Sequence, residues 1–262
     1  MTDSVKVTLS TSSVYTLGPA EGFEIADRLG YDGMEVMILG DPNTQDAVVL
    51  AELVDRYEMP VYSVHAPTLL VTQRVYGNSP WDKIDKSIEL AQVLGAEVIV
   101  LHPPFRWQKE YAESFVEGVA EREASSGLAL AVENMYPWRA GNEWQMYQPD
   151  WNPVPVDYKN VTLDLSHAAT ARCDVLAMQA DLGKRLRHVH LTDGSGSMKD
   201  EHLIPGRGTQ PCAEFLRRLG RSGYDGVVTV EVGTRKLKGE ARDAALRESL
   251  EFARTYLAEG TD

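Results

Sequence analysis

The chain has 262 residues, 43% of them hydrophobic and 25% charged, which is typical of a globular protein with a sizeable core. The formal net charge of −13 disfavours nucleic acid as a partner, because such binding depends on Lys and Arg contacts with phosphates. Two cysteines are too few for a disulfide framework, and no run reaches the roughly 20 apolar residues that span a bilayer. The N-terminal residues do not resemble a signal peptide, so we expect a cytoplasmic protein without membrane contact.

Short β-branched runs alternate along the chain with amphipathic segments rich in Ala, Leu and Glu. The eight runs are Val5–Ser10, Asp32–Met37, Pro60–His65, Ala96–His102, Leu128–Glu133, Asn160–Leu165, Arg187–Thr192 and Gly226–Val232. Helical patterns such as PAEGFEIADRLG and WDKIDKSIELAQVLG lie between the runs, and several end at glycine, as helices commonly do.

Strands that alternate with helices indicate parallel βαβ units. Eight such units, roughly 30 residues apart, indicate an α/β fold, a (β/α)8 TIM barrel that forms a single domain over residues 1–262. A doubly wound open sheet is the alternative. It does not need eight regular units, and the chain has no GxGxxG motif.

The regular spacing is interrupted once, between about residues 134 and 159. This stretch contains three tryptophans, three tyrosines and four prolines and shows little periodicity. One interpretation is a surface insertion that is packed by its own aromatic side chains. We expect instead a long loop on the catalytic face that forms a wall of the active site, because loops of this length in barrels are often functional.

Active sites of such barrels lie at the C-terminal ends of the strands. Seven of the eight predicted strands carry His, Asp or Glu there: Glu35, His65, His102, Glu133, Asp164 with His167 just after it, His188 with His190, and Glu231. A single such residue is more often structural. Packed together, however, the carboxylates would repel one another and lose hydration, at a cost of several kcal/mol each. A bound divalent cation removes that cost, and imidazole with carboxylate suits Zn, Mn, Co or Mg.

The segment from His188 to Gly208 reads HVHLTDGSGSMKDEHLIPGRG and contains three of the six histidines. His188 and His190 are two apart on one strand, so their side chains point the same way. His190 is nearer the rim and is the better ligand. His188 lies one layer deeper and is expected to orient a ligand or the substrate, the alternative being a hydrogen-bonded core histidine.

These motifs resemble those of the xylose isomerase-like TIM-barrel superfamily, which includes sugar isomerases, sugar epimerases and endonuclease IV. The resemblance extends over nearly the whole chain and rests on AVENM, LDLSH, HVHLTD with HLIPGRG downstream, and TVEV. It implies a metal quartet of Glu133, Asp164, His190 and Glu231. It also makes His167 a metal ligand or a substrate contact.

The first activity that the resemblance implies is that of a metal-dependent isomerase or epimerase of a sugar, sugar phosphate or keto-acid. The metal would bind two adjacent substrate oxygens, acidify the C–H group next to the carbonyl and stabilise the enediolate. Glu133 and Glu231 would take the proton and return it. Further substrate contacts are expected from His167, His188, Glu35, Trp138 and Arg207. Arg207 would bind a carboxylate or phosphate, unless it simply faces solvent.

The alternative is an endonuclease IV-like zinc phosphodiesterase that acts on abasic DNA. In endonuclease IV an Asp-x-His pair completes a three-zinc cluster with histidines that follow strands 3 and 4. The residues that correspond here are Asp200 and His202 with His65 and His102, so these four and His167 are candidate ligands of additional ions or substrate contacts.

Several features favour the first activity. The net charge is negative, the TLLVTQRVYG segment after strand 3 has no dense basic stretch, and the aromatic loop suits a small sugar-like substrate. YDGMEVM and GYDGVVTVEV also look like sugar-isomerase versions of strands 2 and 8. A non-catalytic metal or sugar binder is a third possibility, because a fold alone does not imply activity. A homodimer that covers the rim is compatible with the resemblance.

Overall fold

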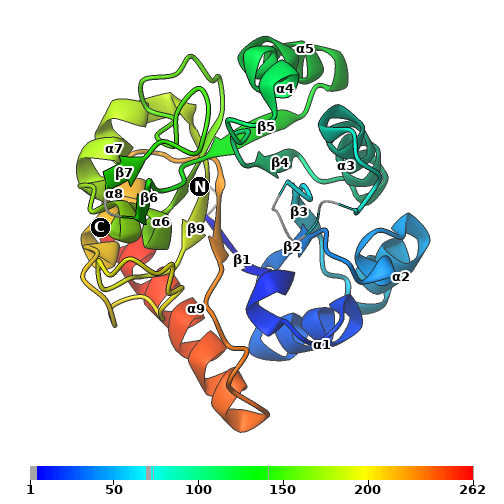
Figure 1. The fold of residues 1–262 in the computed structure, drawn as a ribbon. Helices are drawn as coiled ribbons and strands as arrows, with labels where there is room; N and C mark the ends of the chain where they lie inside the picture. Colours follow the sequence, from blue (N-terminus) through cyan, green and yellow to red (C-terminus); the bar gives the residue numbers. More distant parts are fainter. Residues whose placement is uncertain (1–4, 69–71, 73, 141, 262) are drawn as a thin grey trace.

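The computed structural model describes residues 5–68, 72, 74–140 and 142–261, so part of the TLLVTQRVYG segment lies outside the described residues. Eight parallel strands form a closed barrel that is surrounded by helices, which confirms the predicted (β/α)8 fold (Figure 1). The strands are β1 (Lys6–Ser10), β2 (Gly33–Met37), β3 (Val61–His65), β4 (Val98–Leu101), β5 (Ala129–Glu133), β8 (Val161–Asp164), β9 (Leu186–Leu191) and β10 (Val227–Val230). They pair in the order β1-β10-β9-β8-β5-β4-β3-β2, and β2 pairs with β1 to close the ring.

Helices connect the strands on the outside of the barrel. They are α1 (Pro19–Leu29), α2 (Ala47–Tyr57), α3 (Pro80–Leu94), α4 (Lys109–Glu113), α5 (Phe115–Ser126), α6 (Leu165–Ala171), α7 (Val175–Leu182), α8 (Cys212–Arg221) and α9 (Glu240–Thr261), with 3-10 turns η1 (Thr11–Val14), η2 (Pro42–Thr44) and η4 (Gly183–Arg185). Proline in the first turn favours the start of α3, and Gly95 ends that helix in the left-handed conformation that glycine adopts easily. Among the residues that the structure describes, no helix is both long and apolar enough to cross a membrane.

Successive side chains of a strand point alternately to the apolar core outside the barrel and to its polar interior. In β9, Val189 and Leu191 belong to the main hydrophobic core, whereas His188 and His190 make polar contacts inside the barrel. Inside the barrel the hydroxyls of Thr8 and Thr229, both completely buried, lie 2.7 Å apart. The period-2 pattern of the strand therefore directs the two histidines inward.

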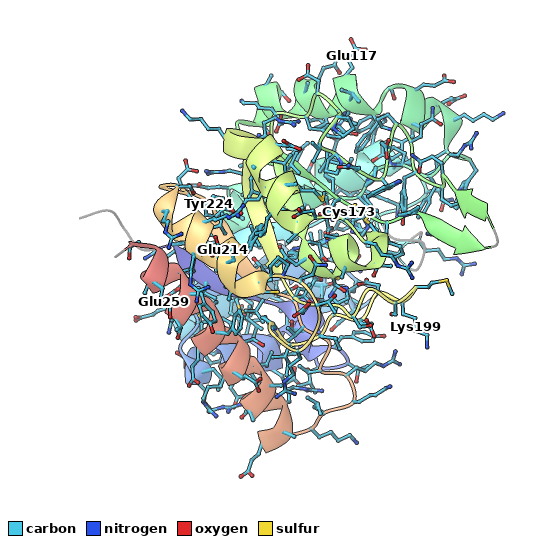
Figure 2. All side chains as sticks on the ribbon, turned by 90° about the vertical axis from the view of Figure 1, so that its left-hand side faces the viewer. Glu117, Cys173, Lys199, Glu214, Tyr224 and Glu259 are labelled. Carbon is cyan, nitrogen blue, oxygen red and sulfur yellow. The ribbon has the colours of Figure 1, made fainter. Side chains whose placement is uncertain are left out.

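The functional face is the end of the barrel at which the strands finish. In Figure 2, Tyr224, which precedes β10, and Lys199, which follows β9, lie at opposite ends of the molecule. The long loop after β5 lies at the end that Lys199 marks and contains a short hairpin, β6 (Trp138–Ala140) and β7 (Asn142–Trp144), that the sequence pattern did not reveal. Backbone hydrogen bonds join the loop to the segment after β4, where Arg106 N donates to Met146 O at 2.9 Å.

Candidate functional site

Four buried side chains meet at the C-terminal end of the barrel. Glu133, Asp164, His190 and Glu231 each offer one ligand atom, and these atoms lie within 4.8 Å of one another. His190 Nδ1 lies 3.0 Å from Glu133 Oε1, 2.9 Å from Glu231 Oε2 and 3.7 Å from Asp164 Oδ2. The structure thus brings together the four residues that the resemblance implies as metal ligands. We call them the quartet.

The charged groups of the quartet favour positive charge at this place. Burial alone lowers the pKa of His190, but the carboxylates of Glu231, Glu35 and Glu133 raise it well above its ordinary value. Burial raises the pKa of Asp164 to about 6. A proton on His190 therefore supplies positive charge among the carboxylates, a charge that a metal ion supplies better.

The donor set of the quartet fits a divalent metal ion. Asp164 Oδ1 accepts the backbone N–H of His167 at 2.7 Å at the start of α6, whereas Oδ2 accepts no hydrogen bond from any described residue. A buried carboxylate oxygen that is held in place without a hydrogen bond is a suitable ligand atom. Three carboxylates and one imidazole match the ligand types of Zn, Mn, Co and Mg sites.

A layer of polar side chains below the quartet holds His190 in place. Glu35 Oε1 lies 3.1 Å from His190 Nε2, and Glu35 Oε2 lies 2.9 Å from His188 Nε2 and accepts the Ser63 hydroxyl at 2.8 Å. With its Nε2 engaged, His190 presents Nδ1 to the quartet. The pair of carboxylate and histidine is the arrangement that orients imidazole ligands in metal sites.

The structure places Glu35 and His188, which were both predicted as substrate contacts, below the quartet. Both are completely buried, and neither lines the cavity described below. Glu35 is two residues before Met37, which does reach the cavity, and His188 is two residues before His190. One pleat of the strand thus places each of them a layer below a residue of the site, the depth that was predicted for His188.

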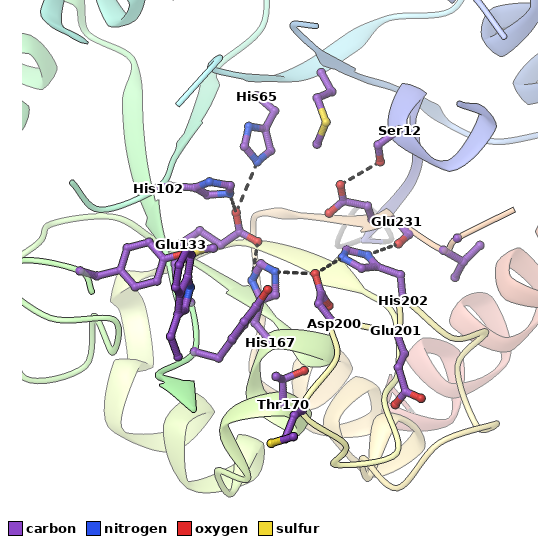
Figure 3. A pocket seen from close by; sticks show the side chains of 18 of the residues that line it. Ser12, His65, His102, Glu133, His167, Thr170, Asp200, Glu201, His202 and Glu231 are labelled. Carbon is purple, nitrogen blue, oxygen red and sulfur yellow. Dashed lines mark hydrogen bonds and ion pairs between the residues drawn. The ribbon is translucent and has the colours of Figure 1, made fainter. Parts of the chain in front are cut away.

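Two further groups of side chains flank the quartet (Figure 3). In the first, His102 Nε2 lies 2.8 Å and His65 Nε2 3.4 Å from Glu133 Oε2. In the second, Asp200 Oδ2 lies 3.2 Å from His167 Nε2 and 2.7 Å from His202 Nε2. All five residues that were predicted as additional ligands or substrate contacts thus lie beside the quartet.

The contacts of His202 favour the protonated form of its ring. Its Nδ1 lies 2.8 Å from the backbone oxygen of Glu231, and its Nε2 faces the carboxylate of Asp200. Both ring nitrogens therefore face acceptors and both must donate. Burial alone lowers the pKa of His202, but Asp200 raises it to about 10.

A cavity of about 940 Å³ opens above the quartet at the rim of the barrel. Of the four quartet residues, Glu133 and Glu231 line the cavity, whereas Asp164 and His190 lie behind them. The long loop contributes Tyr136, Trp138 and Tyr147 to one wall. The two glutamates thus combine a place in the quartet with access to the cavity.

Comparison with known proteins agrees with this geometry. The family model described as xylose isomerase-like TIM barrel matches residues 23–256. The chain belongs to this family. An uncharacterized protein of Mycobacterium tuberculosis is 46% identical over 278 residues, which cover 98% of this chain and 99% of the relative. The fructoselysine 3-epimerase of Shigella flexneri is 26% identical over 261 residues, covering 90% of this chain and 92% of the epimerase.

Solved structures of the xylose isomerase-like type share the fold. The crystal structure of a D-tagatose 3-epimerase-like protein matches with a TM-score of 0.67 and 24% identity, covering 95% of this chain and 98% of that one. The IOLI protein with a bound zinc atom matches with a TM-score of 0.72 and 16% identity, covering 97% and 98%. At these identities the likeness extends to the fold.

Arg207, which was expected either to bind a carboxylate or phosphate or to face solvent, does not line the cavity. It forms an ion pair with Glu248 at 2.6 Å, and its side chain is 58% exposed. The reason lies in the loop: Asp193 Oδ2 accepts the backbone N–H groups of Gly206 and Gly208 at 3.0 and 2.9 Å. These bonds hold the PGRG segment against the barrel and leave Arg207 facing α9.

The sequence reading also missed residues that do reach the site. Ser12, from the turn after β1, donates its hydroxyl to Glu231 Oε1 at 2.8 Å, and Arg235 lines the cavity four residues after Glu231. The prediction of the site rested on His, Asp and Glu at the strand ends. The two serines that follow β1 and the arginine of the GTRK segment were the available signals.

Proposed function

We propose that this protein is a divalent-metal-dependent isomerase or epimerase of a sugar or sugar-like substrate. The observation that carries the proposal is the position of Glu133 and Glu231, which belong to the quartet and also line the cavity above it. The name of the fructoselysine 3-epimerase relative supports the same reaction class for this chain.

The quartet would hold the metal ion through one oxygen of each carboxylate and through His190 Nδ1. When bound, a divalent cation such as Mn, Co, Mg or Zn would polarise the substrate carbonyl and stabilise the negative charge of an enediolate. His167, which also lines the cavity, would donate a hydrogen bond to a substrate hydroxyl. Trp138 would pack against the apolar face of the substrate.

Each glutamate has one oxygen toward the quartet and one turned to another partner. Glu133 Oε1 faces His190 and Oε2 faces His102, whereas Glu231 Oε2 faces His190 and Oε1 accepts from Ser12. In the proposed reaction one glutamate removes the proton next to the carbonyl, and the other returns it. Return on the opposite face of the same carbon gives an epimer. Return to the former carbonyl carbon, with a proton passing from the neighbouring hydroxyl to the former carbonyl oxygen, gives an isomer.

The test is exchange of the substrate proton with solvent. The metal-loaded protein would be incubated in D₂O with a panel of ketoses and with fructoselysine, and loss of the proton signal next to the carbonyl would be followed by NMR. Glu133→Gln and Glu231→Gln should each slow exchange by about 100-fold or more. Glu248→Gln, which removes an exposed carboxylate paired with Arg207, is the control. Exchange that persists in both active-site variants would refute the proposal.

A zinc phosphodiesterase is the second candidate, and the two flanking groups favour it. His65 and His102 with Glu133, and His167 and His202 with Asp164, could each hold a further ion. The charge of the cavity argues against it, because Arg235 is the only Lys or Arg among the described lining residues, while a nucleic-acid backbone requires several. About one metal ion per chain supports the isomerase, whereas two or three tightly held zinc ions with cleavage of abasic DNA would establish the nuclease.

A further inference from the structure

Arg235 is the only Lys or Arg among the described residues that line the cavity. It is exposed, and it forms no ion pair with any acidic side chain that the structure describes. Its guanidinium carbon lies 5.4 Å from the centre of the Tyr15 ring, within the range of a cation–π contact. Arg207, by contrast, forms an ion pair with Glu248 outside the cavity.

The backbone around Arg235 is tied to two neighbouring loops. Gly233 N donates to the backbone oxygen of His202 at 2.8 Å, and the Thr234 hydroxyl donates to the backbone oxygen of Ser13. Leu237 N donates to Thr234 O at 2.8 Å and closes a turn around the arginine. These bonds fix the place from which the arginine side chain extends.

The arginine and the aromatic wall lie across the barrel from each other. In the closed ring β10 stands opposite β4, and β1 stands opposite β5. Arg235 and Tyr15 follow β10 and β1, whereas Phe105 and Trp138 follow β4 and β5. The cavity therefore has a cationic side and an aromatic side, with the reactive glutamates on its floor.

The neighbouring acidic residue of the cavity does not neutralise this arginine. Glu201 also lines the cavity, but its Oε2 accepts the backbone N–H of Ser195 at 2.7 Å and the Ser195 hydroxyl at 2.6 Å. These bonds hold the carboxylate of Glu201 to the loop after β9. The N–H groups of the Arg235 guanidinium can therefore donate to a ligand that enters the cavity. The planar guanidinium can bind a carboxylate or phosphate with two parallel hydrogen bonds.

We propose that Arg235 binds an anionic group of the substrate, so that the sugar-like substrate carries a phosphate or a carboxylate. This inference rests on the proposed function, since it assigns a part of the substrate to the same cavity. Four residues separate Arg235 from Glu231, which limits the distance between their Cα atoms to about 14 Å. The anionic group would thus lie at the β1 and β10 side of the cavity, within reach of a substrate that also contacts Glu231.

The test measures binding to the metal-loaded protein by calorimetry in a buffer without phosphate. The probes are D-fructose, D-fructose 6-phosphate and D-fructuronate, which differ in the charge of one end. At least one anionic probe should bind about tenfold more tightly than D-fructose, because hydrogen bonds between charged groups are strong. A preference for the phosphate or for the uronate identifies which anion the site takes.

The variants separate the arginine from the other charges. Arg235→Gln should abolish the preference and leave the Kd for D-fructose within about twofold, and Arg235→Lys should keep part of it. Arg207→Gln removes the same charge outside the cavity and should bind like the wild-type protein. Equal affinity for all three probes, no binding of either anionic probe, or a preference that survives in Arg235→Gln would overturn the inference.

The outcomes also distinguish this inference from the proposed function. An arginine-dependent preference without exchange of the substrate proton in D₂O would support the anion site and refute the isomerase. Exchange that depends on Glu133, without any preference for anionic probes, would support the isomerase and refute the anion site.

Discussion

Glu35 Oε1 lies 3.1 Å from Nε2 of His190, and this contact leaves Nδ1 of the imidazole directed at the carboxylates of the quartet. The proposed ligand is thus oriented by a residue that has no contact with the cavity. A buried carboxylate in this position also raises the basicity of the imidazole.

We predict that Glu35→Gln weakens metal affinity by about 10- to 100-fold, because the amide orients His190 less well and does not raise its basicity. Competition with a fluorescent chelator measures the change. Glu248→Gln serves as the control, since it removes a carboxylate far from the barrel interior. An unchanged affinity in Glu35→Gln would mean that the layer below the quartet only fills the barrel.

Metal affinity should increase with pH. The carboxylates around His190 raise its pKa well above the ordinary value, although burial alone lowers it. The ring must lose its Nδ1 proton before that nitrogen can bind a metal ion, so a raised pKa extends proton competition to higher pH. Calorimetry between about pH 6 and about pH 8 should show tighter binding at the higher pH and release of protons into the buffer. Affinity that falls over this range would contradict the assignment of His190 as a ligand.

Asp193 should stabilise the fold without acting on the metal. Its carboxylate accepts the backbone N–H groups of Gly194, Gly206, Gly208 and Gln210 and so holds the loop between β9 and α8. Asp193→Ala leaves these groups without their acceptor and should lower the free energy of unfolding by at least about 2 kcal/mol. Urea unfolding of the metal-free protein measures the loss. Asp181→Ala on the exposed side of α7 is the control and should have little effect.

The strands and the rim positions of the quartet residues could be predicted from the sequence because both follow from a local pattern, whereas the choice of these four as metal ligands came from the family resemblance. The period-2 alternation places each strand, and the last inward residue of a strand in a barrel must lie at the rim. The ends of β5 and β8 carry Glu133 and Asp164 for this reason. All eight predicted strands lie within two residues of their observed bounds.

The depth of a side chain inside the barrel depends on register, which the sequence does not display. The pairing of β2 with β3 shifts by one residue between Met34 and Glu35, and Glu35 consequently lies level with Ser63 rather than with Tyr62. Arg207 and Arg235 illustrate the corresponding difficulty for loops. Both arginines follow strands in polar segments. The loop hydrogen bonds, from Gly206 N to the Asp193 carboxylate and from the Thr234 hydroxyl to Ser13 O, determine which of them reaches the cavity.

Ser12 should tune the proposed proton transfer at Glu231. Its hydroxyl donates to Glu231 Oε1 at 2.8 Å, the oxygen that does not face His190. A hydrogen bond to a carboxylate contributes about 1.5–3 kcal/mol, so its loss raises the basicity of Glu231 and frees the side chain to turn. Ser12→Ala should therefore change the rate of deuterium exchange by about tenfold or more.

Ser12→Thr supplies the matched variant, because it keeps a hydroxyl at the same place and should retain most of the wild-type exchange rate. Metal affinity should change little in either variant, since Glu231 Oε2 still faces His190 Nδ1 at 2.9 Å. A parallel loss of metal and exchange in Ser12→Ala would instead assign the hydroxyl to the support of the metal site. An exchange rate equal to that of the wild type would remove Ser12 from the proton-transfer step, leaving the basicity of Glu231 to be set by His190 and by the metal ion.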